Sequence, residues 1–260
     1  IFLTISCKNE TRKEKPIAKD GTLDLRKWDL VKDGPMKLDG EWNFYWKKFI
    51  PPNKINEQKN PSKIKAAKVW TSQKINNENL NRHGYGTYHL KILLNPIDTP
   101  LAIKFPTVGS AYETYVNGKK INQVGQVGKS YETMKPAYRP EVIDFIDFNN
   151  ELDIVIYVSS FHQKYSGLWY SLHFGQSRDI VEIREGNLKN NLFLIGVFII
   201  MMLYHIGLLL LRPSENLPLF FALVCLCLAL RSASVGEITI LSIFPEISLK
   251  WIKSIEYITY

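Results

Sequence analysis

Two kinds of hydrophobic pattern divide this chain. Between residues 38 and 174, apolar side chains recur at alternate positions, the spacing at which a β-strand turns one face towards a core. From Leu192 to Leu211 the sequence reads LFLIGVFIIMMLYHIGLLLL, twenty residues without a formal charge. An α-helix rises about 1.5 Å per residue, so this run matches the roughly 30 Å hydrocarbon core of a bilayer. We therefore predict a β domain followed by a transmembrane helix.

The alternating pattern also predicts individual strands. It recurs in five runs, around Trp42–Trp46, Tyr88–Ile92, Leu101–Phe105, Leu152–Val158 and Leu168–Phe174. The dipeptide Asn117-Gly118 lies between two further strand-like runs and predicts a type I′ hairpin turn, which requires positive φ at both central residues. Regularly spaced strands with no helical run between them predict an all-β jelly roll or β-sandwich over residues 21–176. We expect the tryptophans at positions 28, 42 and 46 in its core.

The remaining segments have other compositions. Residues 1–20 read as the remnant of a secretory signal followed by a polar tether, which implies that the β domain is exported. Residues 177–190 have near-helical apolar spacing and predict a juxtamembrane linker helix. Residues 191–260 are expected to begin a transmembrane bundle, with spans at about 192–211 and 217–235 and a third that begins near 251. A bundle that stops there would be incomplete, so we expect the chain to be part of a longer protein.

The net charge of +8 belongs to the β domain, because residues 191–260 hold four basic and four acidic side chains. The basic residues are mixed with acidic ones, so no nucleic-acid partner is expected, and anionic lipids or glycans fit better. Three cysteines, Cys7, Cys225 and Cys227, form no disulfide framework. Cys7 follows LTIS, as in a lipoprotein cleavage box, and is a candidate for lipid attachment; the alternative is a plain signal peptide. The other two are expected to pack within a span.

Several segments together resemble a known receptor family. They are GTLDLRKWDL, GPMKLDGEWNFYW, GYGTYHLKI, AYETYVNGKKINQVGQVG and the two apolar runs LYHIGLLLLR and LPLFFALVCLCLALR. Their order is similar to that of bacterial seven-transmembrane receptors with diverse intracellular signalling modules (7TMR-DISM). The N-terminal part also resembles the galactose-binding-like jelly roll at the start of family 2 glycoside hydrolases. The resemblance implies a periplasmic, carbohydrate-sensing domain, seven spans, and a C-terminal cytoplasmic effector such as a cyclase, kinase or phosphatase, in the same chain beyond residue 260.

The candidate ligand-binding residues lie in loops of the β domain. Sugars are bound by aromatic rings that stack on their C–H faces and by polar side chains that bond their hydroxyls. Two loops, SYETMKPAYRP and HQKYSG, carry such groups, and Trp169 is expected to face out of the core. The candidates are Tyr131, Tyr138, Arg139, His162, Gln163, Tyr165 and Trp169. Taken singly, each is more often structural, and the same holds for the other loop residues considered, Trp70, Arg82, His83 and Tyr85.

Catalysis and metal binding have little support in the sequence. Glu141, Asp144 and Asp147 have no nucleophile or opposed acid paired with them, so no enzymatic activity of this part is expected. The histidines lack the spacing of metal ligands, so no zinc site and no cofactor are expected, and a structural calcium ion in the sandwich is left open. Within the spans, His205 is expected to bond a neighbouring helix and Arg231 to reach the membrane interface.

The leading hypothesis is a multi-pass receptor of the inner membrane. Its β domain would lie in the periplasm, because Arg212, in the first short loop, favours a cytoplasmic position for that loop. The expected partners are the lipid bilayer, a saccharide or other envelope ligand, and the downstream effector, and a homodimer is compatible with this class of protein. The alternatives are a membrane-anchored envelope-binding module without signalling output and, less well supported, an envelope enzyme.

Overall fold

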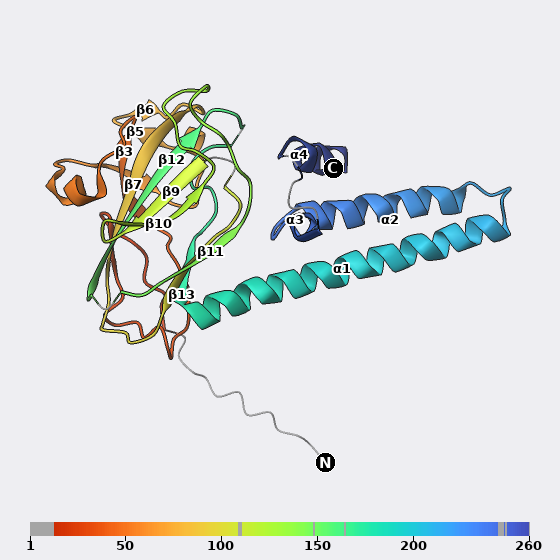
Figure 1. The fold of residues 1–260 in the computed structure, drawn as a ribbon, viewed down its shortest axis with the longest axis horizontal. Coiled ribbons are helices and arrows are strands. Elements are labelled where there is room, and N and C mark those ends of the chain that lie inside the picture. Colours follow the sequence, from red (N-terminus) through yellow and green to blue (C-terminus); the bar gives the residue numbers. More distant parts are fainter. Residues whose placement is uncertain are drawn as a thin grey trace, which may run out of the picture.

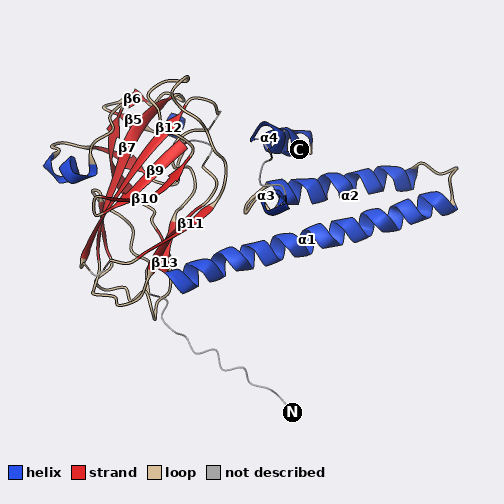
Figure 2. Cartoon of the chain, in the orientation of Figure 1, coloured by secondary structure: helices blue, strands red, loops and turns tan. Residues whose placement is uncertain are grey.

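The computed structural model describes residues 13–108, 111–147, 149–163, 165–243, 247 and 249–259. Figure 1 shows a β-sandwich at the N-terminal side and a set of helices that extends from it, and Figure 2 shows how strands and helices separate between the two parts. The expected fold class, an all-β jelly-roll sandwich followed by apolar helices, is confirmed by this arrangement. Cys7 lies outside the described residues, so its predicted lipid attachment stays a prediction.

One sheet of the sandwich has seven strands. Its order is β10-β9-β12-β7-β3-β4, and β1 pairs in parallel with β7. The strands are β1 (Thr22–Asp24), β3 (Glu41–Trp46), β4 (Ser62–Lys65), β7 (Gly84–Leu93), β9 (Ala111–Val116), β10 (Lys119–Val124) and β12 (Glu151–Ser160). β7 and β12 lie in the middle of this sheet and are buried along most of their length. Their apolar residues therefore anchor the core, as the alternating pattern predicts.

The second sheet has four strands in the order β11-β8-β13-β2. They are β2 (Met36–Lys37), β8 (Leu101–Phe105), β11 (Glu141–Phe145) and β13 (His173–Gln176). A separate small hairpin pairs β5 (Lys74–Ile75) with β6 (Glu78–Asn79), and two 3-10 helices, η1 (Pro52–Glu57) and η2 (Trp70–Ser72), lie in the loops. All five residues of β8 are buried, which shows that both faces of this strand are covered.

The predicted Asn117-Gly118 turn is present between β9 and β10. Asn117 has φ of 47° and Gly118 has φ of 81°, and Val116 pairs with Lys119 across the turn. Positive φ at both positions is what a two-residue type I′ turn requires. The hairpin is therefore confirmed, and its local twist continues that of the sheet.

One sequence expectation about the sandwich is wrong, and one loop residue proves to be buried. The strand expected over Leu168–Phe174 begins only at His173, because the backbone before it forms a loop. Trp70, a loop residue for which a structural role was the more frequent interpretation, is 0% exposed and donates from Nε1 to the hydroxyl of Tyr88 at 2.6 Å. A loop position does not imply exposure here, because η2 folds the indole into the core.

The helical part contains α1 (Ser177–Leu211), α2 (Leu217–Ser234), α3 (Ile240–Ile243) and α4 (Leu249–Ile258). α1 and α2 are long and apolar enough to cross a membrane and lie side by side (Figure 1). The segment predicted as a linker helix and the segment predicted as the first span are one continuous helix of 35 residues, about 52 Å long. His205 bonds its own helix at the carbonyl of Met201 and stacks on Phe221 of α2, so its hydrogen bond is not to a neighbouring helix.

The sandwich and α1 are joined without a flexible linker. α1 begins directly after β13, and the amide of Ser177 donates to the carbonyl of Pro100 at 2.9 Å. The hydroxyl of Ser177 pairs with the carboxylate of Asp144 at 2.5 Å. These bonds tie the first turn of α1 to the residue before β8 and to strand β11.

Candidate ligand site between the sandwich and the helices

The candidate site lies where the four-stranded sheet and two loops of the sandwich meet the helical part. Figure 1 shows the long loops after β10 and β12 on the side of the sandwich that faces α2, α3 and α4. Tyr138, from the first loop, packs against an apolar cluster formed by Ile238, Ile240 and Ile252. The ammonium group of Lys253 lies 3.9 Å from the centre of the Tyr138 ring, close enough for a cation–π interaction. Tyr138 is thus a contact between the two parts of the chain.

An aromatic cavity opens beside this contact. It has a volume of about 400 Å³, and we call it the aromatic chamber. Its lining residues come from both parts of the chain: Tyr138, Gln163, Tyr165, Trp169 and Tyr170 from the sandwich, and Arg231, Lys253, Glu256 and Tyr257 from α2 and α4. The volume falls within the usual range for small-molecule sites, about 300–1,000 Å³. Four of the seven predicted ligand-binding residues are therefore brought together here.

Trp169, which lines the aromatic chamber, is held by its own contacts. Its Nε1 donates to the carbonyl of Thr107 at 3.0 Å, and its ring lies 5.2 Å from that of Tyr165 and 5.6 Å from that of Tyr170. Because these contacts already restrict the Trp169 ring, it loses little further freedom when it stacks on a ligand. Trp169 lies outside the sandwich core, although the strand register from which this was expected does not exist.

The other three predicted residues do not line the aromatic chamber. Tyr131 stacks on His162 with ring centres 4.0 Å apart, and Tyr131 is 60% exposed. Arg139 forms an ion pair with Glu141 at 2.5 Å. Sequence proximity to Tyr138 and Gln163 placed these residues in the same loops, but their side chains are engaged elsewhere.

A second cavity, of about 380 Å³, adjoins the first and shares Tyr138, Tyr170 and Glu256 with it. We call it the polar chamber, because Lys37, Lys104, His173, Asn187 and Glu237 line it. Lys104 on β8 and Glu237 after α2 form an ion pair whose side chains are 6% and 7% exposed. Asn187 of α1 donates to the same carboxylate oxygen at 3.1 Å. Glu237 therefore bonds the sheet and α1 at once.

The polar chamber was not predicted from the sequence. Lys37, His173 and Lys104 are direct cross-strand neighbours in the four-stranded sheet, on the face that the helical part covers. Burial, together with the charges of Lys104 and Lys37, lowers the pKa of His173 below its usual 6.5. A lysine within the apolar pattern of β8 is the one signal that could have marked this face, since a buried lysine requires a partner.

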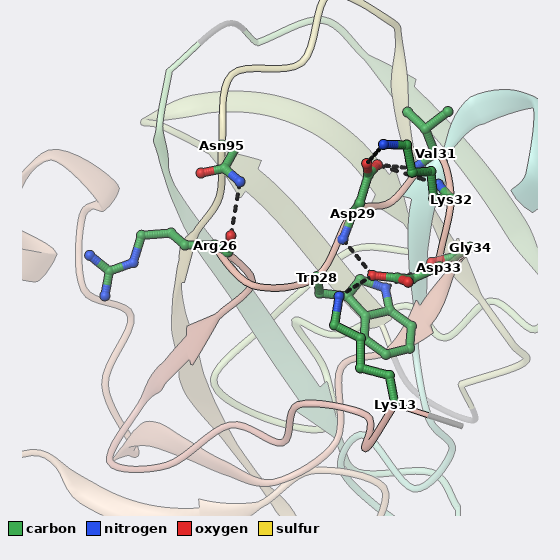
Figure 3. Close-up of polar contacts among 9 residues, drawn as sticks. All are labelled: Lys13, Arg26, Trp28, Asp29, Val31, Lys32, Asp33, Gly34 and Asn95. Atoms are coloured by element: carbon green, nitrogen blue, oxygen red, sulfur yellow. Dashed lines mark hydrogen bonds and ion pairs between the residues drawn. The ribbon is translucent and has the colours of Figure 1, made fainter. Parts of the chain in front are cut away.

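Another cavity, of about 360 Å³, lies away from these residues, beside the loop after β1. Its polar groups hold that loop together, as Figure 3 shows. Asp33 accepts from Lys13 at 2.5 Å and from the amide of Asp29 at 2.8 Å, and Trp28 donates to the carbonyl of Gly34 at 3.0 Å. Asn95 donates to the carbonyl of Arg26 at 2.9 Å. Of the charged side chains that line the cavity, Arg26 pairs with Asp24 at 2.6 Å and Asp29 accepts from the amide of Val31 at 2.9 Å, so this cavity is a weaker candidate than the two chambers.

Comparison with known proteins gives a family match within the helical part. Residues 190–260 match the family model described as 7TM diverse intracellular signalling. The resemblance to membrane signalling receptors, predicted from the sequence, is confirmed by this match. A search of curated proteins found no match.

Among solved structures, the sandwich is similar to parts of much longer glycosidases. A β-glucuronidase from Ruminococcus gnavus aligns at 14% identity over 54% of this chain and 28% of that chain, with a TM-score of 0.40. A β-glucuronidase from Faecalibacterium prausnitzii aligns at 13% identity over 55% and 31%, with a TM-score of 0.43. A GH2 β-galacturonidase from Eisenbergiella tayi, solved with bound galacturonate, aligns at 15% identity over 55% and 24%, with a TM-score of 0.38. The aligned region spans less than a third of each of these chains.

Proposed function

We propose that this chain is the sensor and the first membrane part of a signalling receptor, and that its ligand is a carbohydrate bound in the aromatic chamber. The observation that carries this proposal is the shared lining of that chamber. Five residues of the sandwich and four residues of α2 and α4 face the same volume of about 400 Å³. A ligand held there contacts the sensor and the membrane part simultaneously.

The chemistry of the lining fits a saccharide. Tyr165, Trp169 and Tyr170 offer aromatic faces for the C–H surfaces of a sugar ring. Gln163 offers an amide that both donates and accepts hydrogen bonds, and Arg231 and Lys253 add donors for ring and hydroxyl oxygens. A mixture of a few aromatic surfaces and planar polar groups is characteristic of sites that select by shape and by hydroxyl pattern.

Signal transfer follows from the placement of the chamber. A ligand shifts an equilibrium between two receptor states only by its difference in affinity for them. If the sandwich and α4 move relative to one another, the chamber changes shape, so its ligand distinguishes the two arrangements. α1 starts at β13 and continues through the predicted membrane span as one helix, which gives the movement a rigid path. We propose that it ends at a cytoplasmic effector further along the same protein.

The proposed topology places the sandwich in the periplasm and the loop between α1 and α2 in the cytoplasm. Arg212 begins that loop and pairs with Glu215 at 3.8 Å. We propose binding and not catalysis for this part of the protein. Glu237 and Glu256, the carboxylates nearest the two chambers, are each paired with a lysine, whereas a glycosidase requires one carboxyl group as proton donor.

The test is saccharide binding by the whole chain in detergent, measured by calorimetry. Tyr165→Ala and Trp169→Ala each remove an aromatic face from the chamber and should weaken binding by about 1–3 kcal/mol. Tyr131→Ala is the matched control, because Tyr131 is an exposed loop tyrosine that stacks on His162 outside the chamber. Equal loss in all three variants, or loss in the control alone, would place the saccharide elsewhere.

A further inference from the structure

The polar chamber contains two buried polar atoms that have no hydrogen-bond partner among the described residues. One is Oε2 of Glu237, whose side chain is 7% exposed. The other carboxylate oxygen of Glu237 already accepts from Lys104 and Asn187. The second unpartnered atom is Nδ1 of His173, in the same chamber. Burying a polar atom without a partner is unfavourable, because its hydrogen bonds to water are lost without replacement. The chamber is thus arranged to receive a hydrogen-bonding group.

We propose that the polar chamber binds paired hydroxyl groups of a neutral saccharide, with Oε2 of Glu237 accepting the hydrogen of one of them. This inference rests on the proposed function, because it extends the ligand of the aromatic chamber into the adjoining one. The two chambers share Tyr138, Tyr170 and Glu256, so one ligand of more than a single ring can reach both.

The charges around Glu237 select the class of ligand. An anionic group is attracted by Lys37 and Lys104 but is repelled by the carboxylate oxygen that lacks a partner. A cationic group pairs with that oxygen but meets Lys37 and Lys104, which line the same chamber. A hydroxyl group has neither difficulty. It donates to Oε2, and its own oxygen accepts from a donor such as the ammonium of Lys104, which carries three N–H groups.

His173 is suited to the second hydroxyl of the pair. Its pKa is lowered by burial and by the neighbouring lysines, so at neutral pH the ring is uncharged. An uncharged imidazole has one N–H donor and one acceptor nitrogen, and a hydroxyl group pairs with either. Lys104 and His173 are register neighbours on adjacent strands, so groups bonded to them are held a short distance apart.

The same contact connects the ligand to the membrane part. Glu237 lies in the segment between α2 and α3, pairs with Lys104 of β8 and accepts from Asn187 of α1. A hydroxyl group bonded to Oε2 gives Glu237, which joins β8, α1 and the segment between α2 and α3, a partner for its second carboxylate oxygen. Binding in the polar chamber therefore stabilises the docked arrangement of sandwich and helices relative to any arrangement in which Glu237 has separated from Lys104.

The test uses the full chain purified in lipid-free detergent, with glucose, galactose, mannose and N-acetylglucosamine as neutral probes and glucuronate as the anionic probe. Affinity is measured by calorimetry and stability by thermal unfolding. We expect at least one neutral probe to bind more tightly than glucuronate and to raise the unfolding temperature. Glu237→Gln should weaken its binding about tenfold or more, because a charge-assisted hydrogen bond is lost. Glu215→Gln, the same change in the loop between α1 and α2, should bind as wild type.

His173→Asn is a second variant, and it leaves the ion pair between Lys104 and Glu237 intact. Loss of binding in this variant therefore tests the inference even if Glu237→Gln does not fold. A neutral probe bound equally well by both variants but lost in Trp169→Ala would overturn the inference and leave the proposed function standing. Binding of no probe would overturn both. Tighter binding of glucuronate than of every neutral probe would overturn the neutral class.

Paired hydroxyls are also present in the headgroup of phosphatidylglycerol, so the thermal measurement is repeated in nanodiscs with and without that lipid. Stabilisation by a free neutral probe in lipid-free detergent supports the saccharide as the source. Stabilisation that appears only with phosphatidylglycerol, and that Glu237→Gln removes, would overturn the free saccharide and assign the chamber to a lipid headgroup.

Discussion

Replacing Lys104 by methionine should undock the sandwich from the helices. The substitution keeps the length and packing of the side chain but leaves the carboxylate of Glu237 buried, with its side chain 7% exposed and with Asn187 as its remaining partner among the described residues. Removing one member of a buried ion pair costs about 3–5 kcal/mol, because the other charge is left uncompensated. Undocking returns Glu237 to water and so relieves this cost. Since every 1.4 kcal/mol is about a factor of ten, the ratio of docked to undocked molecules should fall by a factor of about 100 to 4,000.

Hydrogen exchange of the backbone amides measures this change. The amides of Ile238 and Leu241, which bond within the segment after α2, should exchange faster by a similar factor while those of β7 and β12 stay protected. Lys91→Met is the matched control, because Lys91 and Glu151 form an ion pair with side chains 33% and 60% exposed. Exposed pairs contribute about 0–1 kcal/mol, so exchange after α2 should be unchanged in the control.

The double variant Lys104→Met with Glu237→Leu completes the cycle. Replacing a buried ion pair by apolar side chains of similar volume is often neutral or stabilising, so docking should be largely restored. The reasoning is refuted if Lys104→Met exchanges like the wild type, since Glu237 would then not depend on Lys104. It is also refuted if the double variant exchanges as fast as the single one, since the lost charge pair would not be the cause.

Three further predictions concern the sandwich. Gly118→Val should lower the free energy of unfolding by about 1–2 kcal/mol through backbone strain alone, because φ is +81° and nothing lies within 4 Å of the added Cβ atom. Gly186→Ala has equally open space but lies in a helix, so it should not destabilise the protein. Equal melting temperatures for wild type and Gly118→Val would contradict the turn assignment. Trp70→Phe should lower the free energy of unfolding, measured with denaturant, by about 2–4 kcal/mol, since it opens a cavity and removes the 2.6 Å hydrogen bond to the Tyr88 hydroxyl. A smaller loss than in Tyr131→Phe, a substitution of an exposed tyrosine, would contradict the core role of Trp70. The pKa of His173 is lowered from 6.5 in the folded protein, so the unfolded chain binds the proton more readily. The contribution of neutral His173 to the free energy of unfolding should be complete above pH 6.5 and should decrease as the pH falls below it. His173→Gln should flatten this part of the profile of melting temperature against pH, and identical profiles for variant and wild type would disprove the effect.

The strands and the apolar helices could be predicted because both are encoded by local periodicity. The pairs of residues that establish a strand are two positions apart, and a span is an uninterrupted run, so neither depends on the rest of the chain. The Asn117-Gly118 turn is equally local, since it follows from the φ angles that these two residues tolerate. Before His173 the apolar alternation is present but the backbone forms a loop, so the strand prediction was wrong there.

The candidate site was predicted only in part, and the reason is distance along the chain. Loop composition identified Tyr138, Gln163, Tyr165 and Trp169, but it could not show which loop residues point to the same side, so Tyr131, Arg139 and His162 were grouped with them. The residues from α2 and α4 that close the chamber were assigned to the membrane. Nothing local in the sequence indicates that a loop of the sandwich rests on them.

The sequence by itself determined the sandwich, the hairpin and the apolar helices, because each is specified by the order of neighbouring side chains and by the solvent that they avoid. The tertiary structure decided where the two parts of the chain touch. Lys104 and Glu237 are 133 positions apart, and each alone reads as an ordinary charged residue. Their pairing depends on the register that sets Lys104 beside His173 and on the turn that brings the end of α2 back to the sheet. A buried charge requires a partner, but only the assembled fold determines which residue provides it.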